Sequence, residues 1–293
     1  MIHKDKEKFS NLVDRVASLT GFYAPLMEKD YYLTLILSNI NKLSEKLIFK
    51  GGTCLNKIYY SYYRLSEDLD FSMMLPEYTT TRGKRRKCIQ PIKDNIKNFA
   101  TMFDLIVEGA EKAGRNESKQ YVYYLTYDSV ILPSQQAIKF EISLRYSPIL
   151  KPELKEVQHK FLNPFSNEPL FDSGLVNCFS LKEIVSEKLR AAAIRKTIAP
   201  RDFYDLDFIL RQGFDLSDKE VLKLFKTKLE EDGEEPDLKK YKINLGRSDK
   251  EIKEMTSRIE NELFDVLTVT ERKNFNLDIA LIRINKMLGE AII

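Results

Sequence analysis

The feature that most constrains the fold is a continuous pattern between residues 46 and 73. An apolar run over residues 46–50 leads directly into Gly51-Gly52-Thr53. Residues 54–63 then have the composition of a helix, and residues 67–73 alternate as a strand does. Glycines allow backbone conformations that other residues resist. The pattern therefore predicts a strand, a tight turn, a helix and a second strand in direct succession.

The second predicted strand carries two carboxylates, Asp68 and Asp70. Side chains two residues apart on a strand face the same side, with backbones about 7 Å apart. Two such carboxylates repel each other unless a cation lies between them, and hard oxygen ligands suit Mg²⁺. The alternative is the solvent-facing side of an edge strand. If the alternating run 137–145 pairs beside this strand, Glu141 becomes a third carboxylate, and three can hold two metal ions.

The glycine turn has the chemistry of a phosphate site. Backbone N–H groups at Gly51 and Gly52 can approach a ligand closely, and the start of the following helix favours an anion. Thr53 can cap that helix or offer its hydroxyl to phosphate. A plain strand-to-helix turn is the alternative. The Walker A pattern of a P-loop does not occur in the sequence.

The remaining periodicity predicts helices, then a mixed region, then helices. Before residue 180, it predicts helices over 6–19, 25–43 and 80–113, with a break near Pro91, strands over 120–127 and 137–145, and then a loop-rich stretch. After it, helices are predicted over 181–197, 200–211, 217–230, 248–267 and 276–291. We expect an α+β fold, with a small mixed sheet flanked by helices in residues 1–178 and a helical bundle in 179–293.

Two later helices carry charged residues at positions where an apolar or neutral residue would pack as well. Lys188 falls within the apolar stripe of the helix that starts at Leu181, so it needs either an anionic partner such as phosphate or a path to water. Asp202 and Asp205 share one face of the next helix, after Pro200. Helix capping and an ion pair with an arginine would also explain these aspartates.

Composition excludes several classes of protein. The chain has 43% hydrophobic and 31% charged residues and a net charge of +3, with a net charge of +5 in residues 1–150. Three distant cysteines without a C-x-x-C motif favour a reducing cytoplasm, and two histidines make a histidine metal site or a Ser-His-Asp triad improbable. Neither a signal peptide nor a membrane span is expected. A basic cluster is a candidate for nucleic-acid contact or a solvated surface; it comprises Arg82, Lys84, Arg85, Arg86 and Lys87.

The motifs occur in a specific order. They are Lys50-Gly51-Gly52-Thr53, Arg64-x-Ser66-Glu67-Asp68-x-Asp70-Phe71, Glu141, Glu187-Lys188-Leu189-Arg190-Ala191 and Arg201-Asp202-x-Tyr204-Asp205-Leu206. This order closely resembles the AbiEii/AbiGii toxin family, the nucleotidyltransferase-like toxins of bacterial abortive-infection and toxin–antitoxin systems. The resemblance spans roughly residues 30–215.

The resemblance implies a DNA polymerase β-like core that uses an NTP and Mg²⁺, and a cognate antitoxin as partner. It implies metal ligation by Asp68 and Asp70, with Glu141 as third carboxylate, and a functional Lys188. The aspartate of the last motif falls on Asp202 or Asp205. The nucleotide-binding set it implies is Lys50, Gly51, Gly52, Thr53, Lys57, Arg64, Ser66 and Arg201.

Some members of that family modify the 3′ end of tRNA. The function expected from the resemblance is therefore transfer of NMP from an NTP to an acceptor hydroxyl, at a tRNA 3′ end, which blocks translation in the cytoplasm. The same core could instead modify a protein or a small molecule. A non-catalytic module that binds RNA or the antitoxin is the third possibility.

Overall fold

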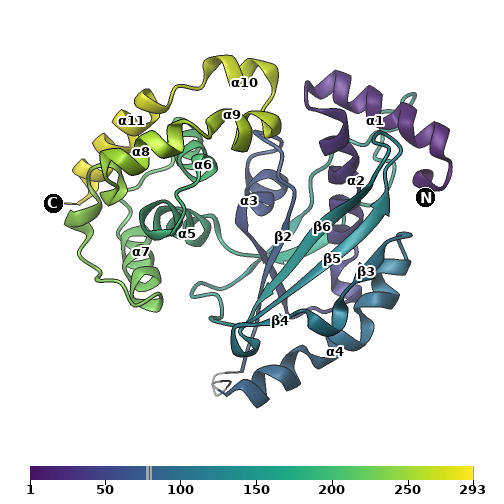
Figure 1. The fold of residues 1–293 in the computed structure, drawn as a ribbon, viewed down its shortest axis with the longest axis horizontal. Helices are drawn as coiled ribbons and strands as arrows, with labels where there is room; N and C mark the ends of the chain where they lie inside the picture. Colours follow the sequence, from purple (N-terminus) through teal and green to yellow (C-terminus); the bar gives the residue numbers. More distant parts are fainter. Residues whose placement is uncertain (77–78, 80, 293) are drawn as a thin grey trace. The chain divides into compact units, whose positions relative to one another are not determined.

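The computed structural model describes residues 1–76, 79 and 81–292 (Figure 1). By their internal contacts they form two compact units, Met1–Phe179 and Ser180–Ile293. That residues 1–178 and 179–293 are two functional domains, a nucleotidyltransferase-like domain and a helical domain, stays a proposal. Among the described residues, no helix is both long and apolar enough to span a membrane.

The first unit contains one mixed β-sheet, as the α+β prediction requires. In the described residues its strand order is β3-β5-β6-β2-β1-β8-β7, and β4 pairs with β5. The pairs β2–β6 and β1–β8 are parallel, and the others are antiparallel. The strands are β1 (Leu47–Lys50), β2 (Leu69–Met73), β3 (Ile106–Glu108), β4 (Gly114–Arg115), β5 (Gln120–Asp128), β6 (Gln135–Ser143), β7 (Glu153–Glu156) and β8 (Leu175–Cys178).

Side-chain alternation gives the central strand β6 one apolar and one partly charged face. Along β6, Ile138, Phe140 and Ile142 are fully buried, whereas the residues between them are half-buried. Phe140 packs against Phe71 of β2, with ring centroids 5.0 Å apart. Because strand side chains alternate, burying the aromatic residues directs the intervening charged residues to the opposite face.

The described residues of the same unit also form the α-helices α1 (Lys6–Thr20), α2 (Ala24–Ser38), α3 (Gly51–Cys54) and α4 (Arg82–Thr101). Figure 1 shows α1 and α2 lying together, and α4 running beside β3. A π-helical segment, Leu55–Tyr59, continues α3. Short 3₁₀ turns occupy Ile2–Lys4, Ile40–Lys42, Ala110–Lys112 and Asn116–Ser118.

The described part of the second unit consists of helices, so the predicted C-terminal helical region is confirmed. Its α-helices are α5 (Leu181–Ile194), α6 (Pro200–Arg211), α7 (Lys219–Glu231), α8 (Asp249–Thr256), α9 (Ile259–Glu262), α10 (Val269–Asn274) and α11 (Leu277–Ala291). The 3₁₀ turns are Leu238–Tyr241, Asn244–Gly246 and Phe264–Val266. Helix α5 packs against both α6 and α7, and α11 packs against α6.

The structure corrects several predicted boundaries. The helix predicted over 80–113 ends at Thr101, and β3 follows, because Ile106–Glu108 pair with the edge of β5. The helix does not break at Pro91. The predicted loop before residue 180 contains β7 and β8, whose four-residue lengths leave little local signal.

Three further helix predictions extended too far toward the C-terminus. The 54–63 helix instead begins at Gly51 and ends at Tyr59, before Tyr62 adopts a positive φ of 62°. The 25–43 helix ends at Ser38, followed by a 3₁₀ turn. The 248–267 helix is divided into α8, α9 and a 3₁₀ turn. In each case the composition favours a helix over a longer range than the tertiary packing supports.

Candidate active site

Charged side chains meet across the three central strands of the first unit. Lys50 at the end of β1 lies opposite Asp70 of β2, and Asp70 lies opposite Glu141 of β6. Directly paired residues on neighbouring strands share a face of the sheet. The condition on which the sequence made Glu141 a third carboxylate, pairing of the two carboxylate-bearing strands, is therefore met. Asp68 comes just before β2 begins and is half-buried.

The two paired carboxylates have opposite electrostatic surroundings. Burial, with repulsion from Glu141 and Asp68, raises the pKa of Asp70 to about 6, although Lys50 and Lys139 act against the shift. Burial also acts to raise the pKa of Glu141, but its neighbours outweigh that effect and the pKa is lowered. Lys139 Nζ lies 2.6 Å from Glu141 Oε2, and Gln120 Nε2 donates to Oε1 at 2.6 Å. Glu141 is thus held as a carboxylate, whereas Asp70 resists ionisation.

This asymmetry predicts how stability depends on pH. We expect Asp70→Asn to stabilise the metal-free protein by on the order of 2 kcal/mol at pH 8, because the folded state holds the Asp70 proton more tightly than the unfolded chain. The gain should shrink as pH falls through 6 and vanish below about pH 4, where both states are protonated. Urea unfolding of both proteins from pH 4 to 8 measures it; an equal difference at both ends contradicts the assignment.

The carboxylates do not form a ready-made metal centre. Over the described residues, no three His, Cys, Asp or Glu side chains are grouped closely enough to hold a metal ion. The donors nevertheless fit a hard divalent cation in kind, since Asp68, Asp70 and Glu141 supply oxygen atoms. Burial, and after it repulsion from Glu141 and Asp68, raises the pKa of Asp70, and a bound cation would offset both effects.

The glycine turn packs directly against this charged row. Gly51 has a φ of +79°, and a Cβ built on it would lie 2.7 Å from Asp70 Oδ2. A Cβ on Gly52 would lie 2.5 Å from Arg64 Nη2. Arg64 itself is buried and donates from Nη1 to the Leu65 carbonyl at 2.7 Å. The two glycines therefore let the start of α3 approach both side chains.

The close approach at Gly51 predicts a stability effect. Gly51→Ala should destabilise the protein by about 1–3 kcal/mol, since the new methyl group meets Asp70 and the left-handed backbone disfavours alanine. Gly289→Ala in α11 is the matched control, because its Cβ would meet nothing within 4 Å. It should stabilise by about 0.5–1 kcal/mol through helix propensity. Equal urea midpoints for the two variants would refute the steric argument.

Thr53 holds the turn in place instead of capping the helix. The N-cap of α3 is Lys50, which makes no side-chain capping bond, so the capping prediction was wrong. The buried Thr53 hydroxyl donates to the Asp68 carbonyl and shares a 2.8 Å hydrogen bond with the Ser66 hydroxyl. Thr53 and Ser66 thus fix the segment that leads into Asp68. Lys50 Nζ lies 5.6 Å from the centre of the Phe179 ring.

Lys57 must be withdrawn from the predicted nucleotide-binding set. Its side chain is fully buried, and Nζ donates to Asp30 Oδ2 at 2.7 Å, Thr34 Oγ1 at 2.8 Å and Tyr62 OH at 2.9 Å. An ammonium group has three protons, so no donor is left for a phosphate. Lys57 therefore stabilises the core that joins the helix after the glycine turn to α2.

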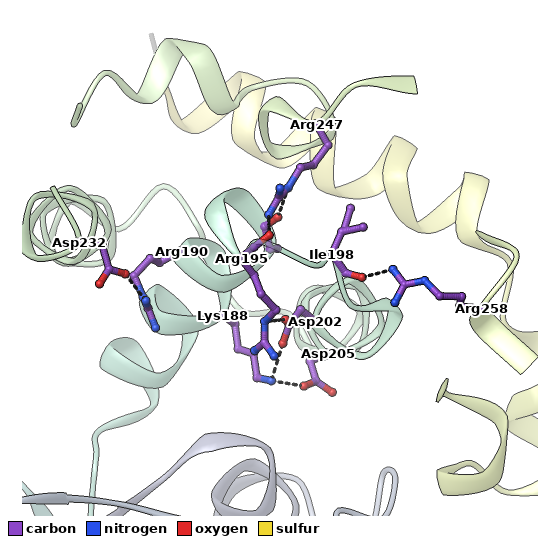
Figure 2. Close-up of polar contacts among 10 residues, drawn as sticks. Lys188, Arg190, Arg195, Ile198, Asp202, Asp205, Asp232, Arg247 and Arg258 are labelled. Atoms are coloured by element: carbon purple, nitrogen blue, oxygen red, sulfur yellow. Dashed lines mark hydrogen bonds and ion pairs between the residues drawn. The ribbon is translucent and has the colours of Figure 1, made fainter. Parts of the chain in front are cut away.

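A second charged cluster lies in the second unit, between α5 and α6 (Figure 2). Lys188 Nζ is 3.0 Å from Asp202 Oδ1 and 2.7 Å from Asp205 Oδ2. The aspartate side chains are 3% and 0% exposed, and that of Lys188 is 12% exposed. Both candidate aspartates therefore contact the lysine, and this pairing explains a cation in an apolar stripe without a bound phosphate.

Arg195 extends this cluster, and the sequence did not single it out. Its Nε lies 3.1 Å from Asp202 Oδ2, while half of its side chain stays exposed. Figure 2 also shows two arginines fixing the connection after α5. Arg247 donates to the carbonyls of Ala192 and Arg195, each at 2.8 Å, and Arg258 donates to that of Ile198.

The sequence analysis did not assign to the site two residues that contact Glu141, Lys139 and Gln120. Lys139 had a signal, since it lies two residues before Glu141 on the same strand face. Gln120 had none, because its contact depends on the register between β5 and β6. Arg201, a predicted nucleotide-binding residue, is half-buried in the first turn of α6, beside Asp202.

Comparison with known proteins identifies the class. The family model described as nucleotidyl transferase AbiEii toxin, type IV toxin–antitoxin system, matches residues 35–276. The chain belongs to this family of nucleotidyltransferase toxins. The family resemblance expected from the ordered motifs is thus confirmed. No match was found among curated proteins.

Solved structures show the same fold. MenT4, a nucleotidyltransferase toxin from Mycobacterium tuberculosis H37Rv, is 16% identical, with a TM-score of 0.60 over 96% of this chain and 98% of that one. A candidate nucleotidyltransferase from H. pylori is also 16% identical, with a TM-score of 0.51 over 92% of this chain and 96% of that one. At this identity the likeness concerns the fold.

Proposed function

We propose that this protein transfers NMP from an NTP to the 3′-terminal hydroxyl of tRNA and thereby blocks translation. The observation that carries the proposal is the charged row Lys50, Asp70 and Glu141 on neighbouring strands, packed against the glycine turn. Membership of the AbiEii family supports the reaction class. MenT4, which is named as a nucleotidyltransferase toxin, supports the toxic outcome.

We infer that Mg²⁺ is the cofactor, with Asp68 and Asp70 as its main ligands. When bound, the ion would supply positive charge to the triphosphate oxygens. Glu141 remains in the proposed ligand set as the third carboxylate and helps to activate the attacking hydroxyl. The lowered pKa of Glu141 keeps its carboxylate ionised at neutral pH, which metal ligation requires.

The other proposed roles concern the nucleotide. Backbone N–H groups of Gly51 and Gly52 would bind phosphate oxygens, with Thr53 and Ser66 fixing the turn. Lys50, Arg64 and Arg201 supply positive charge. Lys188 is proposed to neutralise charge that develops on the pyrophosphate, with Asp202 and Asp205 orienting its amine.

The family is assigned to type IV toxin–antitoxin systems, which implies an antitoxin as partner. We propose that this protein is neutralised by such an antitoxin and acts in the cytoplasm, where tRNA and NTPs are present. A role in abortive infection belongs to the same proposal.

Label transfer tests the proposed reaction. The protein is incubated with Mg²⁺, total RNA, cell lysate and one α-³²P-labelled NTP at a time, and label is followed in RNA, protein and small-molecule fractions. We expect label in tRNA, and its loss when periodate oxidation has removed the 3′-terminal diol. Label in protein or small molecules would support those acceptors instead. Absence of label with all four NTPs would favour a non-catalytic binding module.

A further inference from the structure

Helix α4 concentrates positive charge beyond what its own stability favours. It contains seven Lys or Arg residues and one acidic residue, a net charge of +6, while the whole chain carries +3. Its first turn holds no acidic residue and its last turn no basic one. Cations near a helix N-terminus oppose the helix dipole, and like charges four residues apart repel. Departures from local stability of this kind often mark function.

Four of these cations form a row on one side of the helix. Arg82, Arg86, Lys93 and Lys97 are exposed and spaced four, seven and four residues apart, which places them along about 22 Å of one stripe. We call these four residues the α4 row. Within the described chain no ion pair involves any of them. Helix α6 pairs such a cation within itself, since Arg211 Nε lies 3.0 Å from Asp207 Oδ2.

The side of α4 next to the row fixes the helix to its unit. Ile89, Ile92 and Ile96 are fully buried. Arg85 is buried as well and donates from Nη2 to the Glu117 carbonyl at 3.0 Å, so it does not belong to the exposed surface that the sequence suggested. Glu117 comes three residues before Gln120, whose amide holds the Glu141 carboxylate. The start of the row is therefore tied to the strand that borders the candidate active site.

The chemistry of the exposed face favours a polynucleotide over a membrane. Interfacial helices insert large apolar side chains into lipid. No large hydrophobic residue within α4 is exposed, and Gln90, four residues after Arg86, adds an exposed amide that donates to Asp94 Oδ1 at 2.7 Å. Amide side chains commonly donate to phosphate oxygens. A polynucleotide backbone presents a phosphate every few ångströms, so a straight row of this length can contact several.

We propose that the α4 row binds the phosphate backbone of the acceptor RNA and so supplies affinity without reading sequence. The inference rests on the proposed function only for the choice of RNA as acceptor. Binding is measured without catalysis, so the failure of either proposal can be recognised separately.

The test is fluorescence anisotropy of labelled tRNA with the full-length protein at several salt concentrations. The row variant combines Arg82→Gln, Arg86→Gln, Lys93→Gln and Lys97→Gln. A matched control removes four dispersed exposed charges, Lys6→Gln, Lys46→Gln, Lys151→Gln and Lys286→Gln. We expect the row variant to bind about 10- to 100-fold more weakly, with a salt dependence reduced by about 3 in the log–log slope. The control should change affinity less than about threefold, since its charges are not aligned.

Equal weakening of tRNA binding in both variants would overturn the inference, because it would indicate an effect of net charge alone. The inference would also be overturned if the row variant bound as tightly as the wild type, or if the wild-type protein did not bind RNA. Binding of the wild type to phosphatidylserine vesicles in place of tRNA would assign the row to a membrane. Asp70→Asn should bind tRNA as the wild type does while losing transfer, which separates docking from chemistry.

Discussion

Asp70→Asn should lower NMP transfer by at least about 10³-fold, equivalent to about 4 kcal/mol of transition-state stabilisation. The substitution preserves the size of the side chain but removes a charged oxygen from the strand position between Lys50 and Glu141. A neutral amide is a poor ligand for Mg²⁺ and leaves charge on the triphosphate uncompensated. Transfer to tRNA from labelled NTP, measured at saturating Mg²⁺, gives the result. Asp68→Asn should have a similar effect.

The same variant should be more stable than the wild type at pH 8, as its raised pKa requires. Loss of activity together with gain of stability distinguishes a functional carboxylate from a structural one. Glu67→Gln is the control from the same segment, because its carboxylate pairs with Lys29 at 2.8 Å outside the row. It should keep transfer within about threefold. More than a tenth of wild-type transfer in Asp70→Asn would refute the assignment.

Lys57→Met should destabilise the protein by about 3–5 kcal/mol, since it leaves the Asp30 carboxylate buried without its cation. Urea unfolding measures the loss. Adding Asp30→Asn should recover part of the stability, because the double variant no longer buries an unpaired charge. Lys46→Met, at an exposed site, should change stability by less than about 0.5 kcal/mol.

The Lys57 variants also separate a structural from a nucleotide-binding role. At a temperature where Lys57→Met remains folded, its KM for NTP should equal that of the wild type, because the buried amine has no proton left to donate. A KM raised tenfold in a protein of unchanged stability would restore Lys57 to the nucleotide site.

Side-chain periodicity was sufficient to predict the faces of the strands but not their neighbours. Lys139 and Glu141, two residues apart, share one side of their strand as alternation requires, and they are joined by an ion pair. That Glu141 stands beside Asp70 depends on parallel pairing between strands about 70 residues apart, which was only a condition at the level of sequence. Pairing of this kind is set by the whole sheet, because each strand has two possible edges.

The unusual position of Lys188 could be recognised from sequence, but its partners could not. The helical stripe showed a cation among apolar residues, which requires compensation. Packing of α5 against α6 supplies both Asp202 and Asp205, and the connection between the helices adds Arg195. The structural role of Lys57 could not be recognised from sequence, because a lysine in a helix next to a glycine turn is equally compatible with phosphate binding and with a place in the core.

The sequence by itself determined the order of motifs, hence the family, and the strand–turn–helix–strand unit that contains Gly51 and Asp70. These features depend on local conformation and on alternation, which neighbouring residues encode. The tertiary structure decided which charges meet. Only packing shows that Gly51 must lack a side chain to admit Asp70, that Lys57 belongs to the core, and that Lys139 and Gln120 hold Glu141 ionised. Electrostatic character at a site depends on distance and burial, and neither can be read along the chain.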